Sequence, residues 1–418
     1  MTTTGQLLVF SILIVDGQAE AKLDINWTWQ SSFEKEQYRH STLNVASGET
    51  AVQSLDSLLT SKVEWDSVTG MFALEGNHLL TTASQDAAEK KFIVQDLFWQ
   101  PETALAGVPI DLSIGKERLD WGVGYGFRPL DIFKSYERNP IGLQVDEGVG
   151  AATASYFDGL GQWELVATDE SWASTNTDQA RLAKKQHGIG LRRYALVGNT
   201  ELQGVIYFDQ IHRSTVGGSV VAVLTPALEV HSSFAYAQRY QAYQQGDINE
   251  PVKWGISDDS YQFLLGFNWA NTAGLNIIGE YWYDGRSWDK KMWKQAFQRI
   301  GELSHHSATI DLASSYSYGL DNTSLVAQNV MLHFKMDMSA LHSNDLWLEK
   351  FEPSLDLLVS PTDGGLIATP RLSYQVYESG ASELKLELAS RFYTGLGNSV
   401  YANVPDRDLI FINLKGSF

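Results

Sequence analysis

The last residues of the chain, 409–418, constrain the fold more than any other stretch, because apolar and polar side chains alternate along them. In a strand, successive side chains point to opposite faces. One face would carry Ile410, Ile412, Leu414, Gly416 and Phe418, and the other Leu409, Phe411, Asn413, Lys415 and Ser417. The first face is mostly apolar and ends in an aromatic ring. The pattern predicts a strand with an apolar medium on one side and water on the other.

Two kinds of protein hold such a strand: a soluble sheet with this strand at its edge, or a transmembrane barrel with lipid outside and water inside. The segment resembles the closing strand of bacterial outer-membrane β-barrels, whose last residue is typically Phe. In that family the closing strand is recognised by the barrel assembly machinery. The resemblance implies a location in the bacterial outer membrane and an assembly signal formed by Ile412, Leu414 and Phe418.

Composition agrees with a barrel and excludes several other classes. The 418 residues contain no Cys, so neither disulfides nor thiolate metal sites are possible. The mean hydropathy of -0.19 is too low for a helical membrane protein. The 13 Trp, 18 Tyr, 18 Phe and 35 Gly suit aromatic girdles and tight turns. The net charge of -19 argues against a nucleic-acid partner.

The first 21 residues have the features of a signal peptide. Leu7–Val15 is a short apolar core, and Ala19–Ala21 offers small residues at the cleavage spacing. The usual positive charge is missing, since Met1–Gln6 contains no Lys or Arg. The alternative is a hydrophobic first strand. We expect a signal peptide over 1–21 and a single domain over 22–418, because no linker or internal repeat divides the rest.

Alternation recurs along the chain, and it is clearest in residues 383–391. Leu384, Leu386 and Leu388 share one face of that segment. Ionisable residues occupy the other, namely Glu383, Lys385, Glu387 and Arg391. Charges on the lipid face of a barrel are costly, so this row is expected to face water. A soluble sandwich alternates too, but the aromatic residues near strand ends favour girdles at a membrane surface: Trp27, Trp29, Trp99, Trp269, Tyr281 and Trp282.

Short turns alternate with long loops between these segments. Short turns are expected at 159–161, 198–199, 271–274 and 379–380, and long polar loops at 34–55, 121–148, 169–184, 242–259 and 286–304. In the last of these loops, residues 290–300 have helical spacing and are expected to form a short extracellular helix. The segment 304–355 can be read as helix or strand. The sequence predicts an all-β fold, a transmembrane antiparallel β-barrel of roughly 16–18 strands with long extracellular loops and short periplasmic turns.

The most distinctive internal motif is the segment 118–133, with alternate glycines at Gly122, Gly124 and Gly126. Glycines at this spacing permit close approach of the backbone, and no helix follows that would make a dinucleotide site. The segment resembles one in porin-like and exporter-like outer-membrane families, where a strand feeds a loop that folds toward the lumen. Arg118, Arg128 and Asp131 are therefore constriction candidates. The alternative is a solvated extracellular loop.

Further pore candidates are lumen-facing charges on the predicted strands: Glu280, Glu383, Lys385, Glu387, Arg391 and Lys415. Rings of charge set the preference of a pore for ions. Because acidic and basic residues interleave, we expect a lumen of mixed charge. The glutamates could act as an acid/base pair only if they lay close together.

Motifs for catalysis are weak: the chain has no G-x-S-x-G, H-E-x-x-H or P-loop pattern. His305 and His306 have no third ligand at a metal spacing and are expected in a polar loop. We therefore expect no enzyme, no cofactor and no metal site.

The function predicted is passive diffusion of small hydrophilic solutes through an outer-membrane channel, with membrane lipid and the barrel assembly machinery as partners. Two alternatives remain: an outer-membrane exporter or accessory component for polysaccharide or lipid, whose partner proteins the sequence does not name, and a soluble periplasmic carbohydrate-binding protein.

Overall fold

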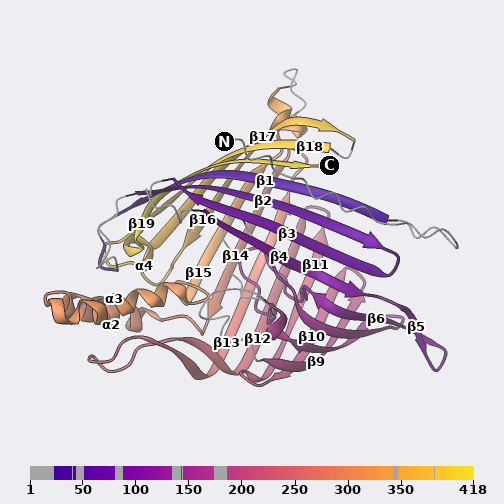
Figure 1. Cartoon of the computed structure of the whole chain (residues 1–418), viewed down its shortest axis with the longest axis horizontal. Coiled ribbons are helices and arrows are strands. Elements are labelled where there is room, and N and C mark those ends of the chain that lie inside the picture. Colours follow the sequence, from indigo (N-terminus) through magenta and orange to yellow (C-terminus); the bar gives the residue numbers. More distant parts are fainter. Residues whose placement is uncertain are drawn as a thin grey trace, which may run out of the picture.

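Strand β1 (Leu23–Tyr38) pairs on one side with β2 (Ala51–Trp65) and on the other with β19 (Asp406–Ser417), which closes the sheet into a barrel. Every pairing in the ring is antiparallel, and each strand pairs with its neighbours in sequence, except that β4 and β5 both pair with β6 (Figure 1). The computed structural model describes residues 23–39, 41–43, 51–80, 88–133, 143, 145–173, 186–341, 347–380 and 382–418. The expected signal peptide, 1–21, lies outside these residues.

The other strands are β3 (Val68–Leu79), β4 (Ala88–Trp99), β5 (Glu102–Leu105), β6 (Val108–Glu117), β7 (Val149–Phe157), β8 (Gly161–Asp169), β9 (His187–Val197), β10 (Thr200–Asp209), β11 (Arg213–Thr225), β12 (Leu228–Gln244), β13 (Lys253–Ala270), β14 (Leu275–Asp284), β15 (Gln328–Met336), β16 (Phe351–Val359), β17 (Gly365–Ser379) and β18 (Ser382–Gly395). The helices are α2 (Lys290–Leu303), α3 (Ile310–Ser314) and α4 (Val400–Asn403), with 3₁₀ turns η1 (Glu170–Trp172), η2 (Ser307–Thr309), η3 (Ser315–Asp321), η4 (Met338–Leu341) and η5 (Leu348–Lys350). No helix in the described ranges is long and apolar enough to span a membrane.

The 19 strand segments make a wall of 18 strands, because β4 and β5 pair with the same strand, β6. Pro101 lies between β4 and β5 and lacks the N–H that a continuous ladder needs. The predicted all-β antiparallel barrel is confirmed, and its strand number lies at the upper limit of the expected range.

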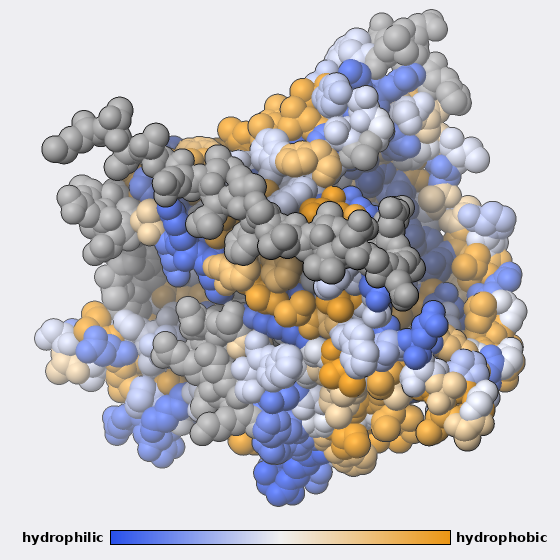
Figure 2. Space-filling model, turned by 45° about the vertical axis from the view of Figure 1, so that its right-hand side comes forward, coloured by the Kyte–Doolittle hydropathy of each residue, from blue (hydrophilic) through white to orange (hydrophobic). Residues whose placement is uncertain are grey.

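The two faces of the wall differ as the alternation predicts. On β18, Leu386 and Leu388 point outward and are exposed, whereas Glu387 points inward and is buried. On β19, Ile412 is 43% exposed and the inward-facing Phe411 is 0% exposed. Figure 2 shows hydrophobic side chains gathered over the lower right of the molecule. An apolar exterior around a polar interior is the residue distribution of a transmembrane barrel.

The prediction for Trp282 is wrong, because this side chain belongs to the lumen and not to an outer girdle. Trp282 is only 5% exposed and stacks on Phe127 with ring centroids 5.7 Å apart. The physical reason is alternation itself: Tyr281 and Tyr283 point outward on β14, so the residue between them points inward. Trp27 and Trp99 do lie exposed on the outer wall.

Most short turns lie at one end of the barrel and most long connections at the other, and the connection between β15 and β16, with η4 and η5, lies at the turn end. The turn end carries both described chain ends and the tight hairpins, including the predicted turns at 159–161, 198–199 and 271–274. The loop end carries the helices, and Figure 1 places α2, α3 and α4 opposite the β5–β6 hairpin. Two predicted loops, 34–55 and 242–259, are too long, because β1, β2, β12 and β13 extend into them as paired strands.

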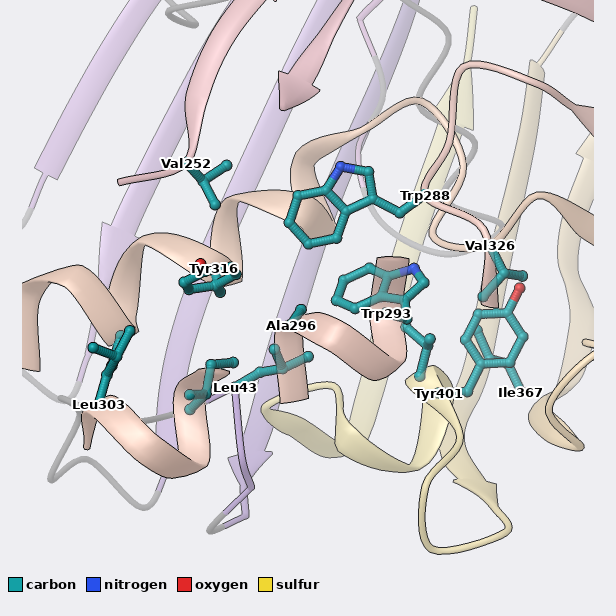
Figure 3. Close-up of a cluster of buried hydrophobic side chains, with 13 residues drawn as sticks. Leu43, Val252, Trp288, Trp293, Ala296, Leu303, Tyr316, Val326, Ile367 and Tyr401 are labelled. Atoms are coloured by element: carbon teal, nitrogen blue, oxygen red, sulfur yellow. The ribbon is translucent and has the colours of Figure 1, made fainter. Parts of the chain in front are cut away.

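A cap of α2, α3, η3 and α4 covers part of the loop end and has its own apolar core (Figure 3). Helix α2, which the spacing predicted, buries Trp293, Ala296 and Ile300 along one face. The Asp289 side chain caps it by accepting a hydrogen bond from the Met292 N–H at 2.7 Å. The ambiguous segment 304–355 divides into the helical turns η2, α3 and η3, the strand β15, the turns η4 and η5, and the first residues of β16. His305 and His306 are exposed between α2 and η2, as expected.

Candidate functional site

The segment 118–133, here called the lumen loop, folds into the barrel from the end of β6. Its start is held by β4, where a bulge at Gln95 points two consecutive side chains inward, Gln95 and Asp96. Asp96 accepts hydrogen bonds from the Arg118 N–H and Nε at 2.9 and 2.8 Å. Gln95 Nε2 donates to the Asp146 carbonyl at 2.9 Å, so the same bulge also holds the end of the connection.

Residues near both ends of the lumen loop pack against the wall at β8, β10 and β12. Trp121 Nε1 donates to Glu164 Oε1 at 3.0 Å, and the Trp121 carbonyl accepts from Gln203 Nε2 at 2.7 Å. Leu130 is fully buried in an apolar cluster with lumen-facing residues of β8, β10 and β12. Apolar burial and hydrogen bonds together fix this part of the loop inside the barrel.

The tip of the lumen loop is held by Glu280 on β14. The Tyr125 and Gly126 backbone N–H groups donate to its two carboxylate oxygens at 2.5 and 2.6 Å, and His231 Nε2 lies 3.0 Å from Oε1. Glu280 is 3% exposed, so these are charge-assisted hydrogen bonds in a largely desolvated place. The loop therefore runs from β6 to β14 across the lumen, and the expectation of a merely solvated loop is not met.

The alternate glycines let the backbone come this close. Gly124 has a φ of +118°, and a Cβ there would lie 2.4 Å from Leu264 Cδ2. A Cβ on Gly126 would lie 2.7 Å from Met331 Sδ. Gly124 needs glycine because of its φ and its close contacts, and a side chain at Gly126 would displace Met331.

The charges of the lumen loop pair with one another. Arg128 Nη1 lies 2.8 Å from Asp120 Oδ1 and 3.4 Å from Asp131 Oδ2. Asp131 also accepts from the Gly122 N–H at 3.0 Å. Burial is the main cause that raises the pKa of Asp131 to about 6, with Arg128 acting in the opposite direction and Asp120 in the same one.

A cavity of about 250 Å³ lies on the loop-end side of the lumen loop, lined by Asp131, Arg128 and Glu170 among others. Burial, and then the nearby Asp209 and Asp169, raise the pKa of Glu170 to about 8. Two carboxyl groups with different raised pKa values therefore border one cavity.

We expect the preference of the pore for cations to increase with pH in two steps. Asp131 gains its charge near pH 6 and Glu170 near pH 8, and each negative charge at the cavity attracts cations. Reversal potentials in a salt gradient between pH 4.5 and 9 measure this. Asp131→Asn should remove the step near pH 6 and keep the step near pH 8. Glu170→Gln should remove the step near pH 8 and keep the step near pH 6. A pH profile that neither substitution changes would contradict the assignment of the two steps to these carboxyl groups.

The raised pKa of Asp131 also affects the stability of the fold. A carboxyl whose pKa is raised in the folded protein stabilises the fold below its unfolded pKa of 3.8, and this contribution is lost as the pH rises to about 6. The contribution of Asp131 to the packing of the lumen loop should therefore be largest below about pH 4 and lost above about pH 6.

The predicted pore residues on β18 and β19 form a second group. Glu383 and Lys385 make an ion pair and, with Lys415, line a cavity of about 370 Å³ at the turn end. Glu387 is buried and lies 3.9 Å from both Arg371 Nη1 and Lys415 Nζ. Arg391 instead borders a cavity next to Gly126 and Phe127 of the lumen loop. Acidic and basic groups interleave here as predicted, but the constriction role of each residue stays a prediction.

Sequence reasoning missed the residues that anchor the lumen loop. Glu164 and His231 lie on the lumen faces of β8 and β12, and each contacts a partner far away in sequence. Alternation within these strands marks them as inward-facing, but nothing in the sequence links them to residues 118–133. The inward direction of Asp96 could not be predicted from alternation, because the bulge at Gln95 reverses the alternation locally.

The fold and the lumen loop define an 18-stranded barrel with one connection folded inside. The solved structures that are similar to this chain include proteins of two bacteria. OccAB3 of Acinetobacter baumannii matches with a TM-score of 0.54 and 10% identity, covering 95% of this chain and 99% of that chain. OccK8 (OprE) of Pseudomonas aeruginosa has a TM-score of 0.52 and 9% identity, covering 95% and 98%.

A third structure, of the outer membrane protein opdK from Pseudomonas aeruginosa, has a TM-score of 0.51 and 9% identity, covering 95% of this chain and 98% of that chain. Comparisons with protein-family profiles and with curated proteins gave no match. At these identities the likeness shows the fold.

Proposed function

We propose that this chain is a bacterial outer-membrane channel for passive diffusion of small hydrophilic solutes. The observation that carries the proposal is a closed barrel, apolar outside and polar inside, with the lumen loop folded across its interior. A soluble carbohydrate-binding protein would need the reverse distribution, with an apolar interior. The likeness to opdK, an outer membrane protein by its description, supports the location.

The path of a solute runs past three groups of charged side chains. It enters at the loop end beside the cap and meets Asp131 and Glu170 in the first cavity. It then passes between the lumen loop and the wall that carries Arg391. It leaves at the turn end past Glu383, Lys385 and Lys415. Polar side chains along this path replace part of the solute's hydration shell, and no bond is made or broken.

Swelling of liposomes that contain the purified protein tests the proposal. Small sugars should enter protein-containing liposomes faster than empty ones, with rates that fall as solute size rises. Equal rates with and without folded protein would refute it. A proposed exporter role makes a different prediction, namely transport that needs a partner protein.

Charge reversal at the turn end should change the preference for ions. Lys385→Glu combined with Lys415→Glu replaces two cations that line the exit cavity. We expect the cation-to-anion permeability ratio to rise, by roughly threefold, because the exit then carries carboxylates only. Reversal potentials measure the ratio. Lys291→Glu, on the exposed face of α2, is the matched control and should leave the ratio unchanged.

The remaining expectations belong to this proposal. Residues 1–21 would direct export and be removed, Phe418 and its strand would be recognised by the barrel assembly machinery, and the outer wall would contact lipid. Phe418 is exposed on the outside, and its N–H donates to the Trp27 carbonyl at 3.1 Å. The terminal residue is thus part of the seam that closes the barrel, which suits a signal read during closure.

A further inference from the structure

A second cavity inside the barrel, of about 150 Å³, lies between the lumen loop and the wall formed by β14–β18. Its lining includes Asp356 and Trp282, and each has a buried polar atom without a hydrogen-bond partner among the described residues, Oδ2 of Asp356 and Nε1 of Trp282. Asp356 is 7% exposed and Trp282 is 5% exposed. Buried polar atoms in proteins are nearly always paired, so these two atoms mark positions where a bound molecule, water or solute, can form hydrogen bonds.

Both side chains are fixed in place by their neighbours. Asp356 Oδ1 lies 2.8 Å from His333 Nδ1, and the His333 ring packs against Tyr125 of the lumen loop. This leaves Oδ2 as an acceptor. The stack with Phe127 holds the Trp282 indole, whose N–H is a donor only. The cavity thus presents one fixed acceptor and one fixed donor.

Arg391 borders the same cavity and brings a positive charge to it. With the His333 imidazole neutral, Asp356 and Arg391 bring opposite charges to the cavity, so a solute with a net charge gains attraction from one and repulsion from the other. The volume suits a molecule of roughly six non-hydrogen atoms, since a cavity of this size holds a benzene ring. The remaining lining is largely apolar, including Met331, Leu358 and Ile367.

We propose that this cavity binds a compact, net-neutral solute that donates an N–H to Asp356 Oδ2 and accepts a hydrogen bond from Trp282 Nε1, as an amide or urea group does. The proposal deepens the channel function and rests on it, because the cavity adjoins the lumen loop. Weak binding beside the narrowest part of a pore favours passage of the bound class at low concentration.

Saturation-transfer NMR on the full-length folded protein in detergent micelles tests the site with N-methylurea as the probe. Methyl acetate is the matched comparator, because it has the same number of non-hydrogen atoms and an acceptor but no N–H. We expect binding of N-methylurea only. Asp356→Asn should weaken it about tenfold by removing the charged acceptor, and Trp282→Phe should weaken it while keeping the stack on Phe127.

Glu352→Gln is the control, because Glu352 lies on the same strand and face but is exposed and pairs with Lys335 at 2.9 Å. A gel shift on boiling shows that each variant is folded. Equal transfer for the two probes, or unchanged transfer in folded Asp356→Asn, would overturn the proposal. Stronger binding of methylammonium or acetate than of N-methylurea would overturn the charge balance. Binding is measured in micelles, where no transport occurs. A failure of the proposed site can therefore be distinguished from a failure of the proposed channel function.

Discussion

The Glu280→Ala variant is expected to conduct better than the unmodified protein, with a unit conductance raised roughly twofold. Glu280 holds the tip of the lumen loop through the backbone N–H groups of Tyr125 and Gly126. Hydrogen bonds to a charged group contribute about 1.5–3 kcal/mol each, so their loss frees the tip from β14 and lets the lumen loop move from its path across the lumen. Single-channel recording in planar bilayers measures the change.

Two further variants separate the position of the loop from the charge in the lumen. Glu280→Gln keeps acceptor oxygen but loses the charge, and it should give an intermediate conductance. Glu352→Ala removes a lumen carboxylate that pairs with Lys335 and does not touch the lumen loop. It should leave the conductance close to that of the unmodified protein. Unchanged conductance in folded Glu280→Ala would mean that the loop is not what narrows the pore.

The Leu388→Arg variant is expected to lose much of its stability in a bilayer. Leu388 is exposed on the outer wall and lies in register with two other outward-facing residues, Leu372 and Ile412. An arginine on the lipid face of a barrel costs about 2–4 kcal/mol at the midplane of the membrane. Urea titration of the protein folded into phospholipid vesicles measures the free energy of unfolding.

A matched arginine on the lumen face isolates the effect of lipid. Ser373 lies on the next strand, points inward and is 3.4 Å from Glu387 Oε2. Ser373→Arg places the same side chain in water beside a carboxylate, and we expect a far smaller loss of stability. If both variants lost the same stability, the assignment of the two faces would be wrong.

Alternation made the wall predictable because it reports a local property, the face to which each side chain points. Leu388 and Glu387 could be assigned to lipid and water from their spacing alone, and the structure agrees. The same rule applied consistently would have placed Trp282 in the lumen, where it packs on Phe127. Trp282 was assigned to a girdle because it is aromatic. The face that a strand residue occupies depends instead on its position in the strand.

The sequence indicated that residues 118–133 fold toward the lumen, but it did not indicate which residues of the wall they contact. The glycines of 118–133 indicated close approach, but Glu280, which holds the tip, is more than 150 residues away in sequence. Only the pairing of the whole barrel brings β14 opposite β6. The extent of β12 and β13 was missed for a similar reason, since polar residues such as Gln244 and Lys253 continue a ladder through backbone pairing alone.

The measurement that tests the central claim most directly is single-channel recording from the purified protein in a planar bilayer. A channel-forming barrel predicts discrete, uniform current steps that appear only with protein that shifts on a gel after boiling. Folded protein that enters the bilayer without current steps would contradict the account.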